Sequence, residues 1–217
     1  MEQIEQIAII ANGDKPSKIV VEKALKGINL IIAADGGGNI CADMDIEPHV
    51  IVGDLDSIYP EVLQKFEYAK IIHNHDQNSS DMQKALQYAM QYKPAKIKIF
   101  SALGYRTDHL LENILIFYYL NVENTDYEKV EISLYDNWGI FRYLDPGKYI
   151  FKNRKGRIVS FFSLREIIEI TMEGFRYNLK SAKFDDFFGG LSNVYESDEC
   201  FLEFKGSRLI WYESHQK

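Results

Sequence analysis

Residues 30–57 read LIIAADGGGNICADMDIEPHVIVGDLDS, and this stretch decides the fold. It contains two apolar runs, Leu30–Ala34 and His49–Gly53, and each ends at an acidic residue followed by small or polar residues. Continuous apolar runs of this length are typical of strands that are buried on both faces of a parallel sheet. The stretch therefore predicts two strands of a layered α/β domain, each leading into a polar loop.

The same alternation of short apolar runs and longer segments of helical spacing continues on both sides of this stretch. Apolar residues at intervals of three and four predict helices between the strands. We therefore expect an α/β domain of three layers with a parallel sheet over residues 1–136. The further expected strands are Ile7–Ala11, Lys70–Ile72, Ile97–Ser101 and Val130–Tyr135, and the expected helices are Pro16–Lys26, Pro60–Phe66, Ser80–Tyr92 and Asp108–Val122.

The pattern changes after about Asn137, where short apolar runs are separated by glycine-containing turns such as Pro146-Gly147 and Gly189-Gly190. Short runs between turn residues are typical of antiparallel strands. We therefore expect a small all-β domain, an antiparallel sandwich or barrel, over residues 137–217. Its expected strands are Lys148–Phe151, Ile158–Ser163, Leu202–Phe204 and Leu209–Glu213.

The composition excludes several classes of partner. A formal net charge of −7 argues against a surface that grips nucleic acid, which needs clustered Lys and Arg. Cys41 and Cys200 lack metal-ligand spacing, so they are predicted to be free thiols in a reducing compartment. The start MEQIEQIAII lacks the positive charge of a signal peptide, and no apolar run is long enough to cross a bilayer. We expect a cytoplasmic protein without nucleic-acid or membrane partners.

Two of the polar loops carry acidic residues where a predicted strand ends. Asp35 is followed by three glycines, which would let the backbone approach a phosphate, although an ordinary tight turn explains this run equally well. Asp54 and Asp56 leave the next strand, and two carboxylates 4 Å apart repel each other by about 4 kcal/mol at an effective dielectric constant near 20. Mg²⁺ would relieve that repulsion, while the alternative is a solvated turn with Ser57 capping a short helix.

Two further loops carry residues suited to phosphate chemistry. Asp81 opens a helix and can cap it, but Asp76 in the same loop means that one carboxylate stays free for a metal or a proton. Arg106 offers a planar fork of donors for phosphate oxygens, and Asp108 could orient that fork or reach a metal through water. The alternative for Arg106 and Asp108 is that they form only a local ion pair.

Each of these loops follows a predicted strand, so one edge of a sheet could gather them in a single cleft. From the residues alone, this predicts magnesium-dependent phosphate chemistry on a nucleotide or a phosphorylated substrate. The residues expected in the cleft are Asp35, Asp54, Asp56, Asp81, Arg106 and Asp108.

Six motifs in this order closely resemble those of the thiamine pyrophosphokinase family. The resemblance implies an α/β domain that holds ATP and Mg²⁺, a β domain that contributes to thiamine binding, and a homodimer with active sites between subunits. Tyr105, where the family often has a second glycine, and Gly38, where alanine is usual, depart from the family pattern. The motifs are ANGD at 11–14, ADGGGN at 34–39, VGDLDS at 52–57, SSDMQKAL at 79–86, GYRTDHLLENI at 104–114 and GLSN at 190–193.

The resemblance also implies roles for individual residues. Asp54, Asp56 and Asp81 correspond to metal ligands and catalytic residues, with Arg106 as a further catalytic residue at the phosphates. Tyr195, Trp138 and Trp211 are aromatic candidates for contact with the flat pyrimidine of thiamine, although such residues more often serve core or interface packing. The expected nucleotide-side residues are Asp35, Gly36, Gly37, Asn39, Ser57, Arg106 and Asp108, and the expected thiamine-side residues are Ser192 and Asn193.

The implied activity is transfer of pyrophosphate from ATP to the hydroxyl of thiamine, giving thiamine pyrophosphate and AMP. Asp81 or Asp56 would accept the hydroxyl proton. Three alternatives stay open. One is a pyrophosphokinase for another alcohol, such as a pterin; another is a phosphatase of the haloacid dehalogenase type, which also places Asp-x-Asp after an apolar strand. The third is a thiamine- or nucleotide-binding protein without turnover.

Overall fold

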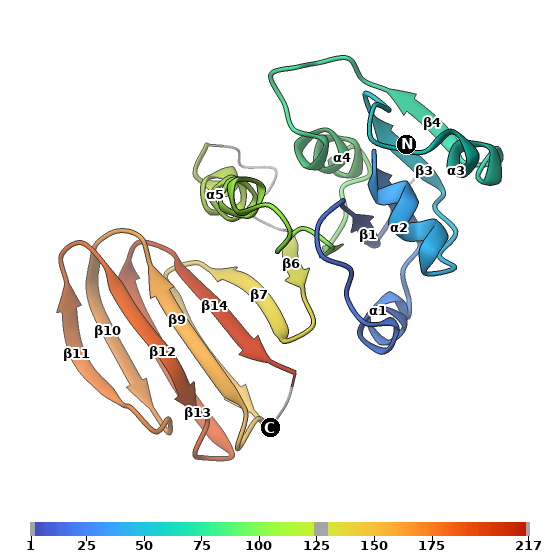
Figure 1. The fold of residues 1–217 in the computed structure, drawn as a ribbon. Helices are drawn as coiled ribbons and strands as arrows, with labels where there is room; N and C mark the ends of the chain where they lie inside the picture. The colour runs from blue at the N-terminus through green and yellow to red at the C-terminus, as the bar shows by residue number, and fades with distance from the viewer. Residues whose placement is uncertain (1–2, 124–129, 216–217) are drawn as a thin grey trace. The chain divides into compact units, whose positions relative to one another are not determined.

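The structure is a computed structural model that describes residues 3–123 and 130–215. It divides into two compact units, Met1–Asn137 and Trp138–Lys217. Strands and helices alternate along the first unit, whereas the described part of the second unit consists of strands and their connections (Figure 1). The predicted fold class, an α/β domain followed by an all-β domain, is confirmed.

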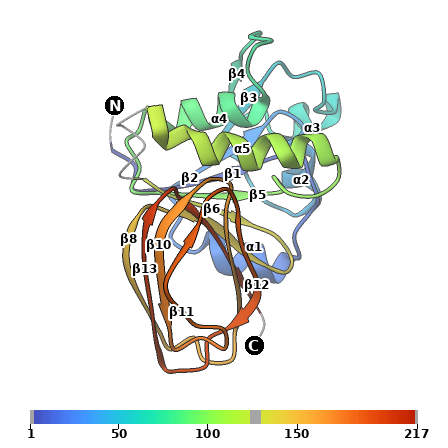
Figure 2. The ribbon, with the colours of Figure 1, turned by 90° about the vertical axis from the view of Figure 1, so that its left-hand side faces the viewer.

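The first unit is built on a parallel sheet with helices on both faces. Its strands are β1 Gln6–Ile10, β2 Leu30–Ala34, β3 Val50–Gly53, β4 Lys70–His73, β5 Lys96–Phe100 and β6 Glu131–Tyr135. Its helices are α1 Lys18–Leu25, α2 Gly37–Asp43, α3 Pro60–Lys65, α4 Asp81–Met90 and α5 Thr107–Glu123. The strands lie in the order β6-β5-β1-β2-β3-β4, and α4 and α5 lie on one side of them with α1 on the other (Figure 2).

The central strands are buried because both of their faces are covered. Ile7 and Ile9 of β1 and Ile97 and Ile99 of β5 have no solvent exposure. Full burial of such a side chain contributes about 1.5–3 kcal/mol. This explains why the continuous apolar runs of the sequence identified the central strands of this sheet to within one residue at either end.

The sheet has a switch point beside β1. The chain runs outward from β1 through β2 and β3 to β4, then returns to place β5 on the other side of β1. The loops after β1 and β5 therefore diverge, and ligands of open α/β sheets bind in the crevice that forms there. The two strand ends are tied together, since Ala11 N–H donates to Phe100 O at 2.9 Å and Gly13 N–H to Ser101 O at 2.6 Å.

The second unit is a sandwich of two antiparallel layers. Its aromatic core includes Phe161, Tyr195 and Trp211. The strands lie in the orders β12-β9-β14-β7 and β11-β10-β13-β8. Their bounds are β7 Gly139–Leu144, β8 Gly147–Lys152, β9 Ile158–Ser163, β10 Ile167–Glu173, β11 Leu179–Phe184, β12 Phe188–Val194, β13 Glu199–Gly206 and β14 Leu209–Ser214.

Four of these strands, β7, β10, β11 and β12, were not expected from the sequence. Gly189 and Gly190 were interpreted as a turn, but they belong to β12, which pairs with β9 and has a register shift between Gly190 and Asn193. Glycines in a strand often mark such an irregularity. The prediction missed the strand because a bulge and a turn have the same local composition.

Two predictions from composition also have an outcome. Cys41 and Cys200 are buried and unpaired, as predicted. Among the described residues, the helices are too short or too polar to span a bilayer.

Candidate active site

A cleft of about 450 Å³ lies at the switch point of the first unit. Its walls come from the loops after β1, β2, β3 and β5 and from the first turns of α4 and α5. The charged side chains in these walls are Asp54, Asp81, Lys84, Arg106 and Glu112. The sequence therefore predicted the right edge of the sheet, because parallel strands bring all their carboxyl ends to the same edge.

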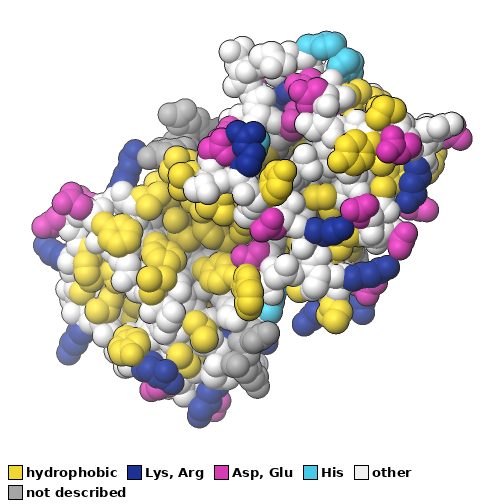
Figure 3. Space-filling view, in the orientation of Figure 1, with side chains coloured by type: hydrophobic (Ala, Val, Ile, Leu, Met, Phe, Trp, Pro, Cys, Tyr) yellow, Lys and Arg dark blue, Asp and Glu magenta, His cyan; other side chains and the backbone are white. Residues whose placement is uncertain are grey.

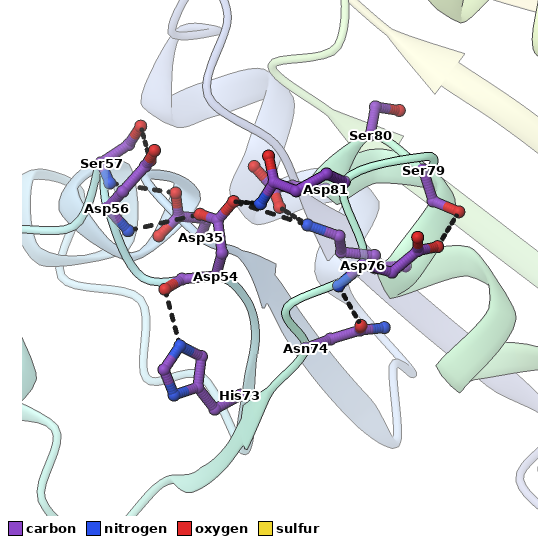
Figure 4. Close-up of polar contacts among 12 residues, drawn as sticks. Asp35, Asp54, Asp56, Ser57, His73, Asn74, Asp76, Ser79, Ser80 and Asp81 are labelled. Atoms are coloured by element: carbon purple, nitrogen blue, oxygen red, sulfur yellow. Dashed lines mark hydrogen bonds and ion pairs between the residues drawn. The ribbon is translucent and has the colours of Figure 1, made fainter.

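Three carboxylates converge beside this cleft. Asp35 follows β2, Asp54 follows β3 and Asp81 is the first residue of α4, and one carboxylate oxygen from each lies within 4.8 Å of the others (Figure 4). Asp35 was predicted to lie on the nucleotide side rather than in the metal group. The donor set consists of oxygen atoms alone, which is the set that Mg²⁺ prefers.

Asp35 has one carboxylate oxygen without a hydrogen-bond partner. Its residue is 1% exposed, and its Oδ2 atom accepts a hydrogen bond from Ser57 N–H at 3.1 Å. Its Oδ1 atom is buried and has no partner among the described residues. Burial, with a smaller contribution from the neighbouring carboxylates, raises the pKa of Asp35 to about 6. A buried oxygen left open beside two other carboxylates fits a divalent cation, which would satisfy it.

The glycines after Asp35 are explained by close packing. A Cβ atom on Gly37 would lie 2.0 Å from Ile10 O, and one on Gly36 would lie 2.2 Å from Asn12 Nδ2. Side-chain-free residues therefore let α2 begin directly against the end of β1. Gly36 lines the cleft, whereas Gly37 packs against β1.

Asn39 ties the loop after β3 to α2. Its Nδ2 donates to Ser57 O at 2.9 Å, and its Oδ1 accepts from Tyr59 N–H at 2.9 Å. The side chain that the sequence assigned to the nucleotide thus holds the Asp54–Ser57 loop in place.

Asp56 is not part of the carboxylate group that Asp54 joins. Leu55, between them, has a φ of +66°, and this left-handed residue turns the chain. Asp56 is exposed and accepts a hydrogen bond from Ser57 Oγ at 2.8 Å, so it lies outside the group of three carboxylates.

In the loop before α4, the structure shows which residues cap the helix and which carboxylate, that of Asp76 or that of Asp81, reaches the cleft. Asp76 accepts hydrogen bonds from Ser79 Oγ at 2.7 Å and from Asn78 N–H at 2.9 Å, and these bonds hold its pKa below the usual range. Ser80 and Gln83 form a capping box at the start of α4. Asp81 is therefore released from capping and is the carboxylate of this loop that joins the cleft.

Lys84 was not predicted as a site residue. Its Nζ atom lies 3.1 Å from Asp81 Oδ1 and 3.7 Å from Asp54 Oδ2, and its side chain is 2% exposed. A signal was present in the sequence, because Lys84 stands three residues after Asp81, among helix residues that are otherwise apolar on the buried face.

Asp54 is held by a second neighbour that the sequence analysis did not identify. Gln77 Nε2 donates to Asp54 Oδ2 at 3.2 Å. Burial alone would raise the pKa of Asp54, but the hydrogen bonds from Gln77 and from the backbone of Asp56, with the charge of Lys84, hold it below its usual value.

Arg106 and Asp108 form the local ion pair that was the alternative interpretation. Arg106 donates to Asp108 through Nε at 3.1 Å and Nη2 at 2.6 Å, and both side chains are exposed. The hydrogen bonds from Arg106 lower the pKa of Asp108 to about 2. Arg106 also lines the cleft, beside Tyr105, which is 80% exposed. A local ion pair and a phosphate-binding role for Arg106 are thus compatible, because Asp108 holds in place a guanidinium that lines the cleft.

The residues expected on the thiamine side lie in β12 of the second unit rather than in a loop. Asn193 is 4% exposed, accepts a hydrogen bond from Tyr177 N–H at 2.9 Å and donates one to Tyr177 O at 2.8 Å. Ser192 is exposed and has a φ of +53°. A groove of about 320 Å³ is lined by Tyr177, Phe188, Leu191 and Asn193, among others.

Two of the three aromatic candidates are core residues. Tyr195 has no solvent exposure, Trp211 is 3% exposed, and Trp211 Nε1 donates to Tyr195 OH at 3.1 Å. These side chains stabilise the sandwich and cannot contact a ligand without leaving the core. Trp138, by contrast, is 73% exposed.

A parallel sheet whose switch-point cleft gathers three carboxylates and an arginine defines an enzyme that acts on phosphate groups. Residues 21–129 match the family model described as the catalytic domain of thiamin pyrophosphokinase, and residues 148–209 match the one described as its vitamin B1 binding domain. The chain belongs to the thiamine pyrophosphokinase family, as its motifs predicted.

Individual relatives agree with this assignment. The thiamine pyrophosphokinase of Bacillus subtilis is 32% identical over 157 residues, which cover 70% of this chain and 71% of the relative. A crystal structure of the Bacillus subtilis enzyme superposes with a TM-score of 0.81 at 26% identity and covers 98% of this chain and 100% of that one. The thiamin pyrophosphokinase of Candida albicans, at 19% identity, shares the fold with a TM-score of 0.84 over 97% of this chain and 89% of its own.

Proposed function

We propose that this protein transfers the pyrophosphoryl group of ATP to the hydroxyl of thiamine and releases thiamine pyrophosphate and AMP. The observation that carries the proposal is the meeting of Asp35, Asp54 and Asp81 beside a cleft that Arg106 also lines, in a chain of this family. A protein that only binds the thiamine cation would need no arginine facing the cleft.

Asp54 and Asp81 would hold Mg²⁺, as the sequence predicts, and the unpartnered Oδ1 of Asp35 would be a third ligand. Bound Mg²⁺ would neutralise phosphate charge and orient the group to be transferred. Asp56 is close in sequence but exposed, so we assign it to the second candidate role, acceptance of the hydroxyl proton.

In the transfer, the thiamine hydroxyl oxygen attacks the β-phosphorus and the bond to the oxygen that bridges the α- and β-phosphates breaks. AMP leaves with the electron pair of that bond, and Asp56 takes the hydroxyl proton. Arg106 binds phosphate oxygens through its planar fork, which Asp108 holds in orientation. The side chains act mainly by position and charge, as is usual for phosphoryl transfer.

We assign the thiamine side to the second unit. Asn193 fixes the backbone of Tyr177, which lines the groove of that unit. Ser192, the residue before Asn193 in β12, is exposed and would supply a hydroxyl to thiamine. Aromatic and apolar walls suit the flat pyrimidine ring of thiamine.

The expected homodimer and the expected cytoplasmic location stay predictions. Hydrophobic side chains cover much of the visible face of the strand-rich unit in Figure 3, and the exposed large apolar residues of that unit include Ile168, Tyr177, Phe187 and Leu191. Exposed apolar surface of this kind is typical of interfaces, which supports a dimer. Light scattering on the purified protein would give twice the chain mass of 25.2 kDa if the prediction is right.

The experiment that tests the function is product analysis after incubation with ATP, Mg²⁺ and thiamine. We expect thiamine pyrophosphate and AMP in equal amounts, abolished in Asp54→Asn and retained in Asp43→Asn, whose carboxylate is an exposed partner of Lys15. ADP, or free phosphate without a need for thiamine, would overturn the proposal and favour a kinase or a phosphatase. Turnover with a pterin alcohol but not with thiamine would change the acceptor, and binding without turnover would indicate a binding protein.

A further inference from the structure

Lys84 is a buried cation beside two of the three carboxylates, Asp54 and Asp81. Its ammonium lies 3.7 Å from Asp54, which follows β3, and 3.1 Å from Asp81, the first residue of α4, and its side chain is 2% exposed. The rest of the buried face of α4 is largely apolar and includes Met82, Ala85 and Leu86. An apolar side chain of similar length would fill this space without the desolvation cost of a charge, so packing alone does not explain a lysine.

The charge balance of the group gives Lys84 a specific role. Three ionised carboxylates with one ammonium leave a net charge of minus two, which a single divalent cation neutralises. Without the ammonium, the group would carry three negative charges within a few ångströms, and mutual repulsion would move the flexible members apart. Asp81 is the first residue of α4, where an unpaired side chain is free to turn away.

We propose that Lys84 is a positioning residue for the transfer reaction: its ammonium holds Asp54 and Asp81 together before the metal arrives. The inference rests on the proposed function, because it concerns the same carboxylates. Lys84 acts on the reaction through these two side chains and is not assigned a contact with the substrates.

The test compares Lys84→Met with the unaltered protein in the absence of ATP and thiamine. Removal of the ammonium exposes an approaching cation to the full charge of the carboxylates, so Mg²⁺ should bind the free protein at least tenfold more tightly. The melting temperature should fall in EDTA, and saturating Mg²⁺ should raise it by more than it raises that of the unaltered protein. At saturating Mg²⁺, ATP and thiamine, kcat should fall at least tenfold because the carboxylates are no longer held in register.

A purely structural role gives a different result. Lys84→Met would then lose the same stability in EDTA and in Mg²⁺, and its affinity for Mg²⁺ would stay unchanged, which would overturn the proposal. If Lys84→Met does not fold, Lys84→Gln removes the same charge with a polar side chain, and the same comparison applies. Lys84→Arg keeps the charge and should bind Mg²⁺ within a few-fold of the unaltered protein.

Lys96→Met serves as a matched control, since Lys96 is an exposed lysine of β5 whose partner is Glu131. It removes one positive charge away from the cleft and should change neither the Mg²⁺ affinity nor the Mg²⁺-dependent rise in melting temperature. The metal measurements need neither substrate, so their failure leaves the proposed transfer intact. Absence of thiamine pyrophosphate from the unaltered protein would instead reject the proposed function and leave the metal result standing.

Discussion

The backbone N–H of Ser57 donates to Oδ2 of Asp35 at 3.1 Å and so joins the loop after β3 to the residue that follows β2. One oxygen of this buried carboxylate is thus fixed by the fold, while its Oδ1 is left without a partner among the described residues. The backbone of Ser57 therefore helps to orient the Asp35 carboxylate. Its charge remains costly until a cation or a proton arrives.

This cost predicts that the difference in unfolding free energy between Asp35→Asn and the unaltered protein depends on pH. The folded-state pKa of Asp35 is raised from 3.8 to about 6, so the folded protein binds this proton more tightly than the unfolded chain does. The free energy of unfolding of the metal-free protein therefore loses on the order of 3 kcal/mol from this residue as the pH rises from about 4 to above 6. The unfolding free energy of Asp35→Asn should not fall in this way, because asparagine does not ionise.

Urea unfolding in EDTA at pH values from 4 to 7 measures this difference. The stability of Asp35→Asn relative to the unaltered protein should increase across that interval and then level off. A difference that is constant with pH would mean that Asp35 titrates normally. Saturating Mg²⁺ should restore the stability of the unaltered protein more than that of the variant.

Gly37→Ala should destabilise the first unit strongly. Its Cβ would lie 2.0 Å from the backbone oxygen of Ile10, and backbone atoms of a central strand cannot move aside cheaply. Overpacking of this kind costs on the order of 3 kcal/mol. Gly147→Ala is the control, because its nearest neighbour would be Asp145 O at 3.8 Å. Thermal unfolding of both variants checks the prediction, and equal melting temperatures would contradict it.

Arg106→Lys should weaken the use of ATP without a change in stability. The lysine keeps the charge but loses the planar fork, so kcat/KM for ATP should fall roughly 10- to 100-fold. The Arg106–Asp108 pair is exposed, and the low pKa of Asp108, about 2, keeps it ionised until the pH falls towards that value. Activity above pH 5 should therefore not report the titration of Asp108.

Steady-state kinetics and thermal unfolding together test the role of Arg106. Arg176→Lys, at an exposed arginine paired with Glu196, is the matched control and should behave as the unaltered protein. A fall in melting temperature that accompanied the loss of activity in Arg106→Lys would show that the residue supports the fold instead.

Substitutions at Ser192 and Asn193 should have different effects on stability but a similar effect on thiamine binding. Asn193→Ala removes the bonds to the backbone of Tyr177 and should cost about 1–3 kcal/mol of stability. Ser192→Gly should stay within about 1 kcal/mol of the unaltered protein, because glycine accepts the φ of +53°. Both should raise the KM for thiamine, by roughly tenfold for a lost hydroxyl contact. An unchanged KM in Ser192→Gly would remove Ser192 from the thiamine side.

The sequence predicted those parts of the molecule that depend on local pattern. The strands of the first unit were found because burial on both faces demands continuous apolar runs, and the site loops were found because parallel strands end at one edge. Asp54 and Asp81 were placed in the same group for this reason. The motifs then supplied the substrate class, which the residues alone left open.

What escaped prediction depends on contacts between distant residues. Lys84 was missed because its partner Asp54 lies thirty residues away in the sequence, and only the packing of α4 on the sheet brings them together. Asp35 was expected in the same cleft, but the family resemblance assigned it to the nucleotide side, and nothing local indicates that its carboxylate turns toward Asp54. In the second unit, Gly189 and Gly190 were taken for a turn because a strand irregularity leaves no signal beyond glycine itself.

The capping box of Ser80 and Gln83 has a consequence for redesign of the enzyme. Because these two residues start α4, the neighbouring Asp81 and Lys84 can be randomised in a saturation library without removing the signal that begins the helix. Library members at Asp81 should retain the start of α4 and differ mainly in the charge and reach of the group beside the cation. Members at the buried Lys84 need a stability screen first. Assay of the stable members with Mn²⁺ or another divalent ion in place of Mg²⁺ then sorts them by metal preference.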